Sequence, residues 1–264
     1  MRVGDVAFGV QVVGYETGVG DDEPPALQVA VDGAVSREPL APGRELEYSL
    51  GQRRCAGVVD GDDHVACDAS AAPYCQAHDS TWVCARCTGT CLKAEMDCHQ
   101  EHAIYLAAFA PSTFKVGVTR RSDPRVRLRE QGADRGAIIR RVSNGRIARE
   151  IEADIAASEP LSDVVRTAVK VAGLGKPIDE TAWKRLLSRF EVSARHSFDY
   201  GLGLDATPVA ETLAAGTVRG TKGRILVLDR GDDTFAVDMR ALVGYEVRSE
   251  PPSRRLQSSL GRFE

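Results

Sequence analysis

Residues 102–133, HAIYLAAFAPSTFKVGVTRRSDPRVRLREQGA, decide the fold expected for this chain. They begin with an apolar run of strand-forming residues, pass a short turn containing proline, and continue into a second such run at 114–119. Two runs of this kind joined by a short turn predict a β-hairpin. An arginine-rich segment follows, where Ser122 or Asp123 as N-cap, a proline in the first turn and Gly132 as stop predict a helix. Hairpin and helix together would aim Tyr, Thr and Arg side chains at one place.

The segment after this stretch extends the prediction to a mixed α/β domain over residues 103–195. Residues 137–142, A-I-I-R-R-V, are a further strand candidate, with β-branched residues at 138, 139 and 142. In 146–157 isoleucine recurs every four residues, a spacing typical of one face of a helix. Two further helices are expected at 161–172 and 178–190, because acidic and hydroxyl residues stand near their starts and glycines separate them.

Short strands are expected on both sides of this domain. Residues 1–54 and 208–248 contain β-rich runs separated by Gly, Pro and Asp clusters, a pattern of small barrels or meanders. The two segments are candidates for one common unit, because chain ends often meet. The tail, 250–264, is rich in Pro, Ser and Arg, and we expect it to be poorly ordered. The expected class is therefore α+β, an α/β core flanked by small barrel-like β segments.

Composition is that of a globular protein. The chain has 264 residues, 43% of them apolar and 27% charged, which suits two or three domains. No apolar run reaches the roughly 20 residues of a membrane helix. The N-terminus alternates apolar and polar residues, so we expect no signal peptide, no membrane partner and a cytoplasmic location.

Charge is distributed unevenly along the chain. Residues 115–149 contain eleven Lys and Arg against three acids, a local net of +8, whereas the whole chain carries -4. The remainder must then sum to -12. A cationic segment on an acidic body predicts a polyanionic partner such as DNA or RNA. The alternative is a solvated charged helix surface without a partner.

Residues 55–102 are expected to form a cysteine-rich, zinc-binding module. All seven cysteines and four of the five histidines lie in this window. The pairs Cys75-x-x-His78 and Cys84-x-x-Cys87 have the two-residue gap with which a tight turn places two ligands on one tetrahedral ion. In a protein without a leader, clustered cysteines are more often metal ligands than disulfides.

The number of ligands predicts about two structural Zn²⁺ ions per chain, and redox or iron–sulfur chemistry is the less favoured alternative. From their order along the chain we group four ligands into each site. The first group is Cys55, Cys67, Cys75 and His78. The second group is Cys84, Cys87, Cys91 and Cys98. His64 and His99 remain possible replacements, and the spacing leaves the pairing open.

Two resemblances follow from these patterns. The sequence C-A-G…C…C-x-x-H…C-x-x-C-x-G-x-C…C, continued by H-x-x-Y-L-A…K-V-G-V-T…E-Q-G-A, resembles the domain of unknown function family 2797 over most of the chain. Within it, residues 103–155 resemble the GIY-YIG nuclease superfamily, in the branch whose second motif reads K-I-G. Ala103-Ile104-Tyr105 stands where that family has Gly-Ile-Tyr, and Lys115-Val116-Gly117 stands at its second motif.

The GIY-YIG resemblance implies a site and an activity. It implies a divalent-metal-dependent endonuclease that hydrolyses phosphodiester bonds, with Mg²⁺ or Mn²⁺ as cofactor. The residues that it implies are Tyr105, Lys115, Arg127 (or Arg125) and Glu152 (or Glu150). The first glycine of the family is Ala103 here, and the histidine of many nuclease members has no clear counterpart. The alternative function is a zinc-dependent DNA- or RNA-binding protein on the same scaffold that does not cleave.

Overall fold

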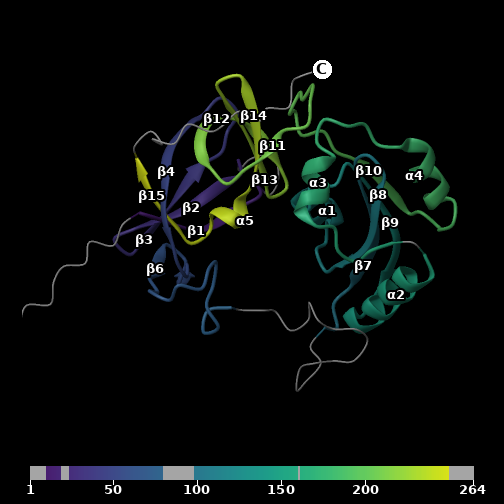
Figure 1. Cartoon of the computed structure of the whole chain (residues 1–264). Coiled ribbons are helices and arrows are strands. Elements are labelled where there is room, and N and C mark those ends of the chain that lie inside the picture. Colours follow the sequence, from purple (N-terminus) through teal and green to yellow (C-terminus); the bar gives the residue numbers. More distant parts are fainter. Residues whose placement is uncertain (1–9, 19–23, 80–97, 160, 250–264) are drawn as a thin grey trace, which may run out of the picture. The chain divides into compact units, whose positions relative to one another are not determined.

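The computed structural model describes residues 10–18, 24–79, 98–159 and 161–249 (Figure 1). The chain divides into two compact units. The first, which we call the β unit, consists of Met1–Asp79 and Pro208–Glu264. The second, the α/β unit, is Ser80–Thr207. In the chain, the α/β unit is therefore inserted between the two halves of the β unit.

The α/β unit is built on a four-stranded sheet with the order β10-β9-β7-β8. Its strands are β7 (His102–Phe109), β8 (Thr113–Thr119), β9 (Arg135–Val142) and β10 (Ala194–Ser197). All neighbouring strands are antiparallel. Every residue of β7 is buried, because this strand pairs on both edges and is covered on both faces. This burial on both faces accounts for the apolar run in the sequence of β7.

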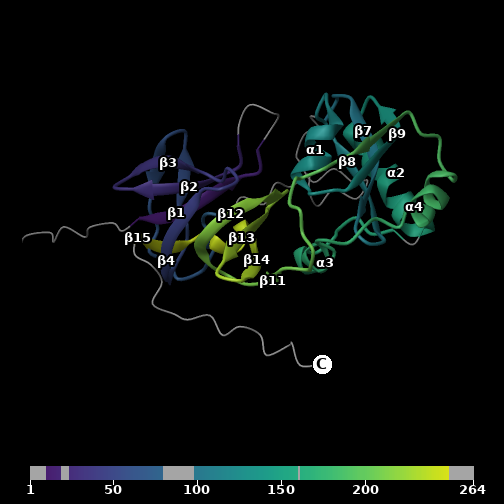
Figure 2. The ribbon, with the colours of Figure 1, turned by 90° about the horizontal axis from the view of Figure 1, so that it is seen from above.

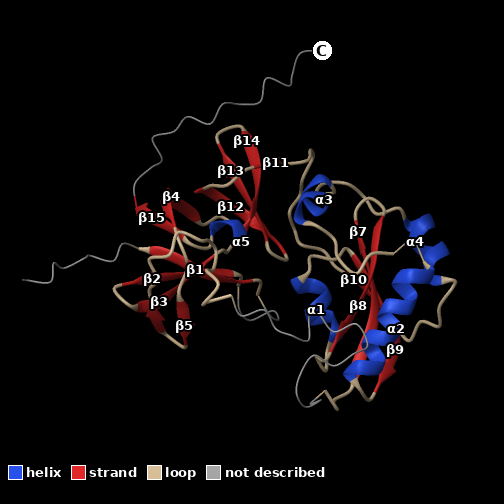
Figure 3. Cartoon of the chain, turned by 60° about the horizontal axis from the view of Figure 1, so that its bottom comes forward, coloured by secondary structure: helices blue, strands red, loops and turns tan. Residues whose placement is uncertain are grey.

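Helices cover the two faces of this sheet (Figure 3). One face packs against α2 (Gly145–Ser158) and α4 (Glu180–Leu187), through a core that contains Ile104 and Leu106 of β7. The other face packs against α1 (Pro124–Glu130), where Tyr105 shares a core with Leu128 of the helix. Because strand residues alternate between faces, Tyr105 points to the α1 side and its neighbours point to the α2 side. The sequence order thus places a tyrosine under the arginine-rich helix.

The predicted limits of the helices are only partly correct. Asp123 is the N-cap of α1, and its carboxylate accepts a hydrogen bond from the Arg125 backbone N–H. The helix expected over 161–172 is much shorter, because α3 covers only Thr167–Ala172. Among the preceding residues, Ser162 instead forms an isolated parallel bridge with Lys115 of β8, and its carbonyl accepts from the Val116 N–H at 3.2 Å. This bridge to β8 lies where the first turn of the predicted helix would begin.

The β unit contains one sheet of eleven strands with the order β11-β14-β13-β12-β4-β15-β1-β2-β3-β6-β5 (Figure 2). The strands from the N-terminal half are β1 (Gln11–Glu16), β2 (Ala26–Val31), β3 (Ala34–Pro39), β4 (Glu45–Arg53), β5 (Val58–Asp60) and β6 (Asp63–Val65). The strands from the C-terminal half are β11 (Val209–Ala210), β12 (Ala214–Lys222), β13 (Ile225–Arg230), β14 (Asp233–Asp238) and β15 (Tyr245–Ser249). A short helix, α5 (Met239–Leu242), precedes β15.

The two halves of the chain meet at β4, which pairs antiparallel with both β12 and β15. One apolar core joins them and includes Val12, Leu46, Leu226 and Val247. The expected barrel-like closure is not found in the described part of the chain, where β11 and β5 remain the two ends of the sheet. The short lengths of β5 and β11 leave few backbone groups with which an edge could pair, as closure would require.

Candidate metal centre and central polar cluster

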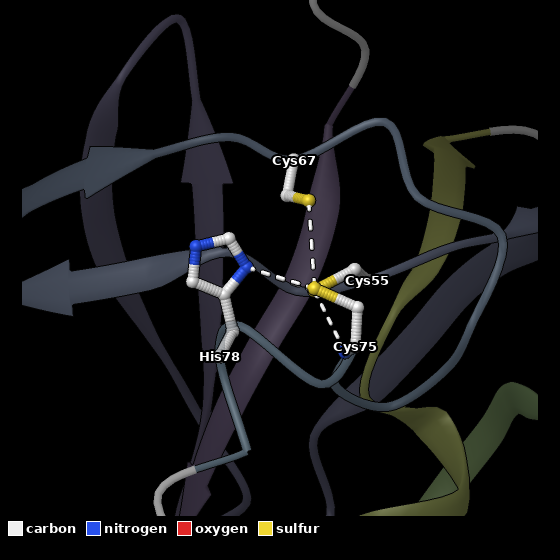
Figure 4. Close-up of side chains that lie close together, drawn as sticks. All are labelled: Cys55, Cys67, Cys75 and His78. Atoms are coloured by element: carbon white, nitrogen blue, oxygen red, sulfur yellow. Dashed lines mark hydrogen bonds between the residues drawn. The ribbon is translucent and has the colours of Figure 1, made fainter.

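Three cysteines and one histidine of the β unit lie together and point toward one another (Figure 4). They are Cys55, Cys67, Cys75 and His78, and their ligand atoms all lie within 4.8 Å of one another. The His78 Nδ1 is 3.4 Å from the Cys55 Sγ and 3.3 Å from the Cys75 Sγ. The Cys67 and Cys75 Sγ atoms are 4.0 Å apart. These are the four residues that the sequence analysis groups as the first site.

The size of this cluster suits a zinc ion. With Zn–S bonds of about 2.3 Å, two thiolates of a tetrahedral site lie roughly 3.8 Å apart. The distance of 4.0 Å between the Cys67 and Cys75 Sγ atoms is close to that value. Thiolate and imidazole ligands in a closed set of four are typical of structural zinc sites. The Cys3His cluster can therefore hold one Zn²⁺ ion.

Backbone N–H groups point at the cysteine sulfurs. The Cys55 Sγ accepts from the N–H of Gly57 at 3.4 Å and from the N–H of Cys75 at 3.3 Å. Burial opposes ionisation of the Cys75 thiol, but backbone N–H groups of Ala77 and His78 and the neighbouring thiols lower its pKa to about 7. Gly57 has φ +67°, and a Cβ there would come 2.0 Å from the Val65 carbonyl oxygen. The turn thus requires glycine and supplies donors to a thiolate.

Two buried polar side chains tie this cluster to the sheet. The Gln11 Nε2 donates to the carbonyls of Cys55 and Gly244, at 3.3 and 3.0 Å. The Arg54 Nη1 donates to the Cys67 carbonyl at 3.2 Å, and its Nε pairs with Glu246 at 3.2 Å. Residues of β1, β15 and the turn before β15 therefore hold the cysteine loop. Of the module predicted over residues 55–102, residues 55–79 belong to the β unit and residues 80–102 to the α/β unit.

The second predicted group of ligands is only partly described. Cys84, Cys87 and Cys91 lie outside the described residues, whereas Cys98 lies within them. A Cβ added to Gly145 would come 2.8 Å from the His102 Nε2 and 3.0 Å from the Cys98 Cβ, so both side chains lie against this glycine. The His102 Nδ1 is 2.7 Å from the Gln100 carbonyl oxygen, which leaves Nε2 as the acceptor nitrogen. His102 is thus a ligand candidate that the sequence pairing omits.

The proposed replacement histidines have other positions. The His64 Nε2 is 2.8 Å from the Ala56 carbonyl oxygen and is absent from the cluster of four. His99 is exposed. Neither residue is needed to complete the first group of ligands.

Protein purified without added metal is expected to contain about two equivalents of zinc, because the sequence offers two groups of four candidate ligands and four ligands suffice to close one site. Elemental analysis by plasma mass spectrometry measures this number. Cys75→Ser should lower it by about one equivalent, since only the first group loses a ligand. A content below about half an equivalent in the unaltered protein, with all seven thiols reacting freely, would contradict the prediction.

Tyr105 and Lys115 lie on the same face of the central sheet. In the pairing of β7 with β8, Tyr105 faces Gly117 and Ala107 faces Lys115, so the two side chains are two positions apart. A Cβ on Gly117 would come 2.5 Å from the Cζ and Oη atoms of Tyr105. The glycine of the K-V-G sequence therefore leaves the space in which the tyrosine ring lies.

Both side chains are buried, and burial shifts their ionisation. Tyr105 is 1% exposed and Lys115 is 9% exposed. Burial raises the pKa of Tyr105, and Arg127 and the Gln131 amide partly oppose that rise. The Gln131 Nε2 donates to the Tyr105 Oη at 2.6 Å. Burial also lowers the pKa of Lys115 to about 8, although Glu152 acts in the opposite direction. The Lys115 Nζ donates to the Asp163 carbonyl at 2.7 Å.

Arg127 of α1 and Glu152 of α2 complete this polar cluster. Each of them acts electrostatically on both Tyr105 and Lys115. Glu152 is 8% exposed and accepts from the Arg149 Nη1 at 2.6 Å. Tyr105, Lys115, Arg127 and Glu152, from β7, β8, α1 and α2, thus lie within electrostatic range of one another, and we call them the central polar cluster.

The two alternative residues make other contacts. Arg125 pairs with Asp123 at 2.6 Å, and its charge acts on His196. Glu150 pairs with Arg146 at 2.9 Å on the exposed side of α2. Neither residue appears among the groups that act most strongly on Tyr105 or Lys115.

Sequence reasoning did not single out Gln131 as part of the cluster. The signal that could have indicated it is its position, one residue before the predicted helix stop at Gly132. A side chain at the end of α1 lies over the sheet. Its contact with Tyr105 depends on the strand register, which the sequence alone does not determine.

The fold and the sites define the class of this protein. It is a mixed α/β protein, mostly sheet with few helices, that carries a Cys3His cluster suited to zinc. None of the described helices has the length and apolarity of a membrane span. The chain belongs to the family described as "Protein of unknown function (DUF2797)", whose model matches residues 43–247. No curated protein and no solved structure matches the chain.

Proposed function

We propose that this protein is a divalent-metal-dependent nuclease with a GIY-YIG-like core in its α/β unit and a structural zinc site in its β unit. One observation carries the proposal. Four residues that are far apart in sequence, on four different elements, form the central polar cluster, and they are the residues that the GIY-YIG resemblance implies. Two cations, a carboxylate and a phenol at one place suit the chemistry of a phosphodiester.

Each residue of the cluster has a role in this proposal. Arg127 binds the phosphate through its planar guanidinium, and Lys115 adds a second positive charge. Tyr105 Oη must first ionise, which burial opposes and Arg127 favours, and the phenolate then accepts one proton from the attacking water. The new bond to phosphorus forms as the bond to the leaving oxygen breaks, and that oxygen takes its proton from solvent. Glu152 would hold a divalent ion, which supplies neutralisation of charge on the phosphate and the leaving oxygen.

A second function, binding of nucleic acid without cleavage, is favoured by one specific observation. Tyr105 and Glu152 are almost fully buried, and the Glu152 carboxylate is already paired with Arg149. A carboxylate in an ion pair must exchange that partner before it can bind a metal ion. In this alternative the arginines of residues 115–149 bind phosphates and the central polar cluster only stabilises the fold.

A cleavage assay decides between the two functions. Branched, duplex and single-stranded DNA and RNA are incubated with the purified chain and either Mg²⁺ or Mn²⁺. The nuclease proposal expects cleavage of at least one substrate, which chelation of the divalent ion abolishes. Tight binding without cleavage of any of these substrates would reject the nuclease and support the binding protein.

The arginines of α1 are expected to contribute to binding in both functions. Neutralising phosphates releases counterions, so affinity should fall steeply with salt, with a slope of roughly -0.9 per phosphate contact on duplex DNA. Replacing Arg125, Arg127 and Arg129 by alanine should make the dependence of log affinity on log salt less steep, with a slope smaller in magnitude by about two to three. Fluorescence anisotropy between low and moderate salt measures it.

A matched control for this measurement is Arg189→Ala. Arg189 is an exposed arginine of the same unit that lies outside the basic segment and pairs with Glu159. It should leave the slope nearly unchanged. If the triple variant binds with the same slope as this control, the arginines of α1 form a solvated surface and not a binding site.

A further inference from the structure

The E-Q-G-A sequence of residues 130–133 ends α1, and the proposed function assigns it no role. The Ala133 N–H donates to the Leu128 carbonyl at 3.1 Å, and Gly132 has φ +71°. A glycine in this conformation after the last helical turn is a common helix stop. The stop fixes the backbone of Gln131 directly above the face of the sheet that carries Tyr105.

Gln131 is held by a second helix as well. Its carbonyl accepts from the Nζ of Lys170, a residue of α3, at 2.7 Å. The same Nζ lies 4.6 Å from the centre of the Phe109 ring. The end of α1 is therefore anchored to α3 and to the central strand β7. A side chain on such an anchored backbone keeps one position relative to the sheet.

The side-chain amide of Gln131 meets the hydroxyl of Tyr105. Its Nε2 donates to the Tyr105 Oη at 2.6 Å. Its Oε1 is buried and has no hydrogen-bond partner among the described residues. The amide is thus oriented with its donor toward the tyrosine.

We infer that Gln131 is a positioning residue that orients the Tyr105 hydroxyl for proton transfer, an inference that rests on the proposed function. Because the Tyr105 oxygen accepts the amide N–H, its own proton is directed away from Gln131. The same N–H stabilises the oxygen when it carries negative charge, which is the form that accepts a proton from water. The positive charge of Arg127 also favours the ionised form of this oxygen.

The neighbouring residue supports Arg127 in a similar way. Glu130 pairs with the Arg127 Nη1 at 3.1 Å and with the Arg121 Nη2 at 2.6 Å. Two consecutive residues of the helix end therefore hold the proposed phosphate ligand and the proposed proton acceptor. This gives the E-Q-G-A sequence one role, which is to fix the relative positions of Arg127 and Tyr105.

The contact can be tested without any activity, by nuclear magnetic resonance of protein labelled with ¹³C at the tyrosine Cζ. The chain has six tyrosines, and the resonance missing from Tyr105→Phe belongs to Tyr105. Gln131→Met keeps most of the side-chain volume and removes the donor, so it should shift this resonance more than any other. Gln28→Met is the matched control, because the Gln28 Nε2 also donates to a side chain, Glu16, but lies in the β unit. It should leave the Tyr105 resonance unchanged.

Kinetics then test the role of the contact. Gln131→Met should lower kcat about 3- to 10-fold, the range of one lost hydrogen bond, with KM changed less than about twofold. The pH midpoint of kcat should rise in the order wild type, Gln131→Met, Gln131→Glu, because the phenolate first loses a donor and then gains a negative neighbour. A loss of packing alone would lower kcat without moving this midpoint.

The possible outcomes separate the two ideas. An unmoved Tyr105 resonance in both Gln131 variants overturns the inference. Cleavage by the wild type with an unmoved pH midpoint in both variants also overturns it. A shifted resonance in a protein that cleaves no substrate supports the Gln131–Tyr105 contact and rejects the nuclease. If Gln131→Met does not fold, Gln131→Glu, which is closest in size to glutamine, decides by the same measurements.

Discussion

Glu152→Ala is expected to abolish cleavage and to leave nucleic-acid affinity within about threefold of the wild type. The carboxylate would act mainly through the divalent ion in the transition state, and binding would depend on the arginines. Glu152→Gln removes the charge but retains an oxygen that can accept from Arg149, so it separates loss of metal binding from loss of the contact between the two side chains. Turnover with Mg²⁺ and affinity without it are measured on the same substrate.

Glu150→Ala is the matched control for Glu152→Ala. Glu150 lies two residues earlier on the same helix and pairs with Arg146 at the surface, so it should keep nearly full turnover. In the same assay Tyr105→Phe should lower turnover about 10²-fold or more, because it keeps the ring and removes only the hydroxyl. Arg127→Lys should also impair turnover, because it keeps the charge and loses the planar fork. Cleavage that persists in both Glu152→Ala and Glu150→Ala would show that neither carboxylate holds the metal.

Cys75→Ser is expected to destabilise the β unit so strongly that its cooperative unfolding transition is lost. Structural zinc sites contribute on the order of 10 kcal/mol, whereas a whole domain is stable by about 5–15 kcal/mol. Gln11 and Arg54 connect the cysteine loop to β1, β15 and the turn before it, so the loss would not stay local. Hydrogen exchange should then increase in peptides of the β unit, while peptides of β7 and β9 keep the protection of the wild type.

Ser70→Ala is the control for the metal centre. Ser70 is an exposed residue of the same loop, between two ligands, and its substitution should change stability by no more than about 0.5 kcal/mol. If Cys75→Ser unfolds at the same temperature as Ser70→Ala and retains its zinc, the cluster does not stabilise the β unit. Chelation is a weaker test, because it would also remove an ion from the second predicted site.

Much of the α/β unit follows from local sequence patterns. The β7–β8 hairpin, the capped helix α1 and the four-residue spacing of isoleucine in α2 all depend on interactions between residues close in the chain. The same holds for two ligands of the metal centre, Cys75 and His78, which lie on one turn. Patterns of this kind can be read without knowing what packs against them.

Features that depend on distant partners could not be read in this way. Residues 161–166 have the composition of a helix start, but Ser162 instead bridges to Lys115 on the edge strand β8. Closure of the β segments into a barrel depends on pairing between β11 and β5, which are separated by most of the chain. The contact of Gln131 with Tyr105 requires both the helix stop and the strand register, so neither motif alone indicates it.

The insertion of the α/β unit into the β unit has a consequence for the order of events during synthesis. When the ribosome has released β4, its two neighbours in the sheet, β12 and β15, are still more than 150 residues away from being made. The inserted unit has all its strands in one continuous segment and can fold first. During that interval β1, β2 and β3 form only part of the sheet and β4 has neither of its two partners, so unpaired strand edges are open to other chains. Cys55, Cys67, Cys75 and His78 are already complete at that stage, so a bound ion would hold this unfinished half together until the last strands arrive.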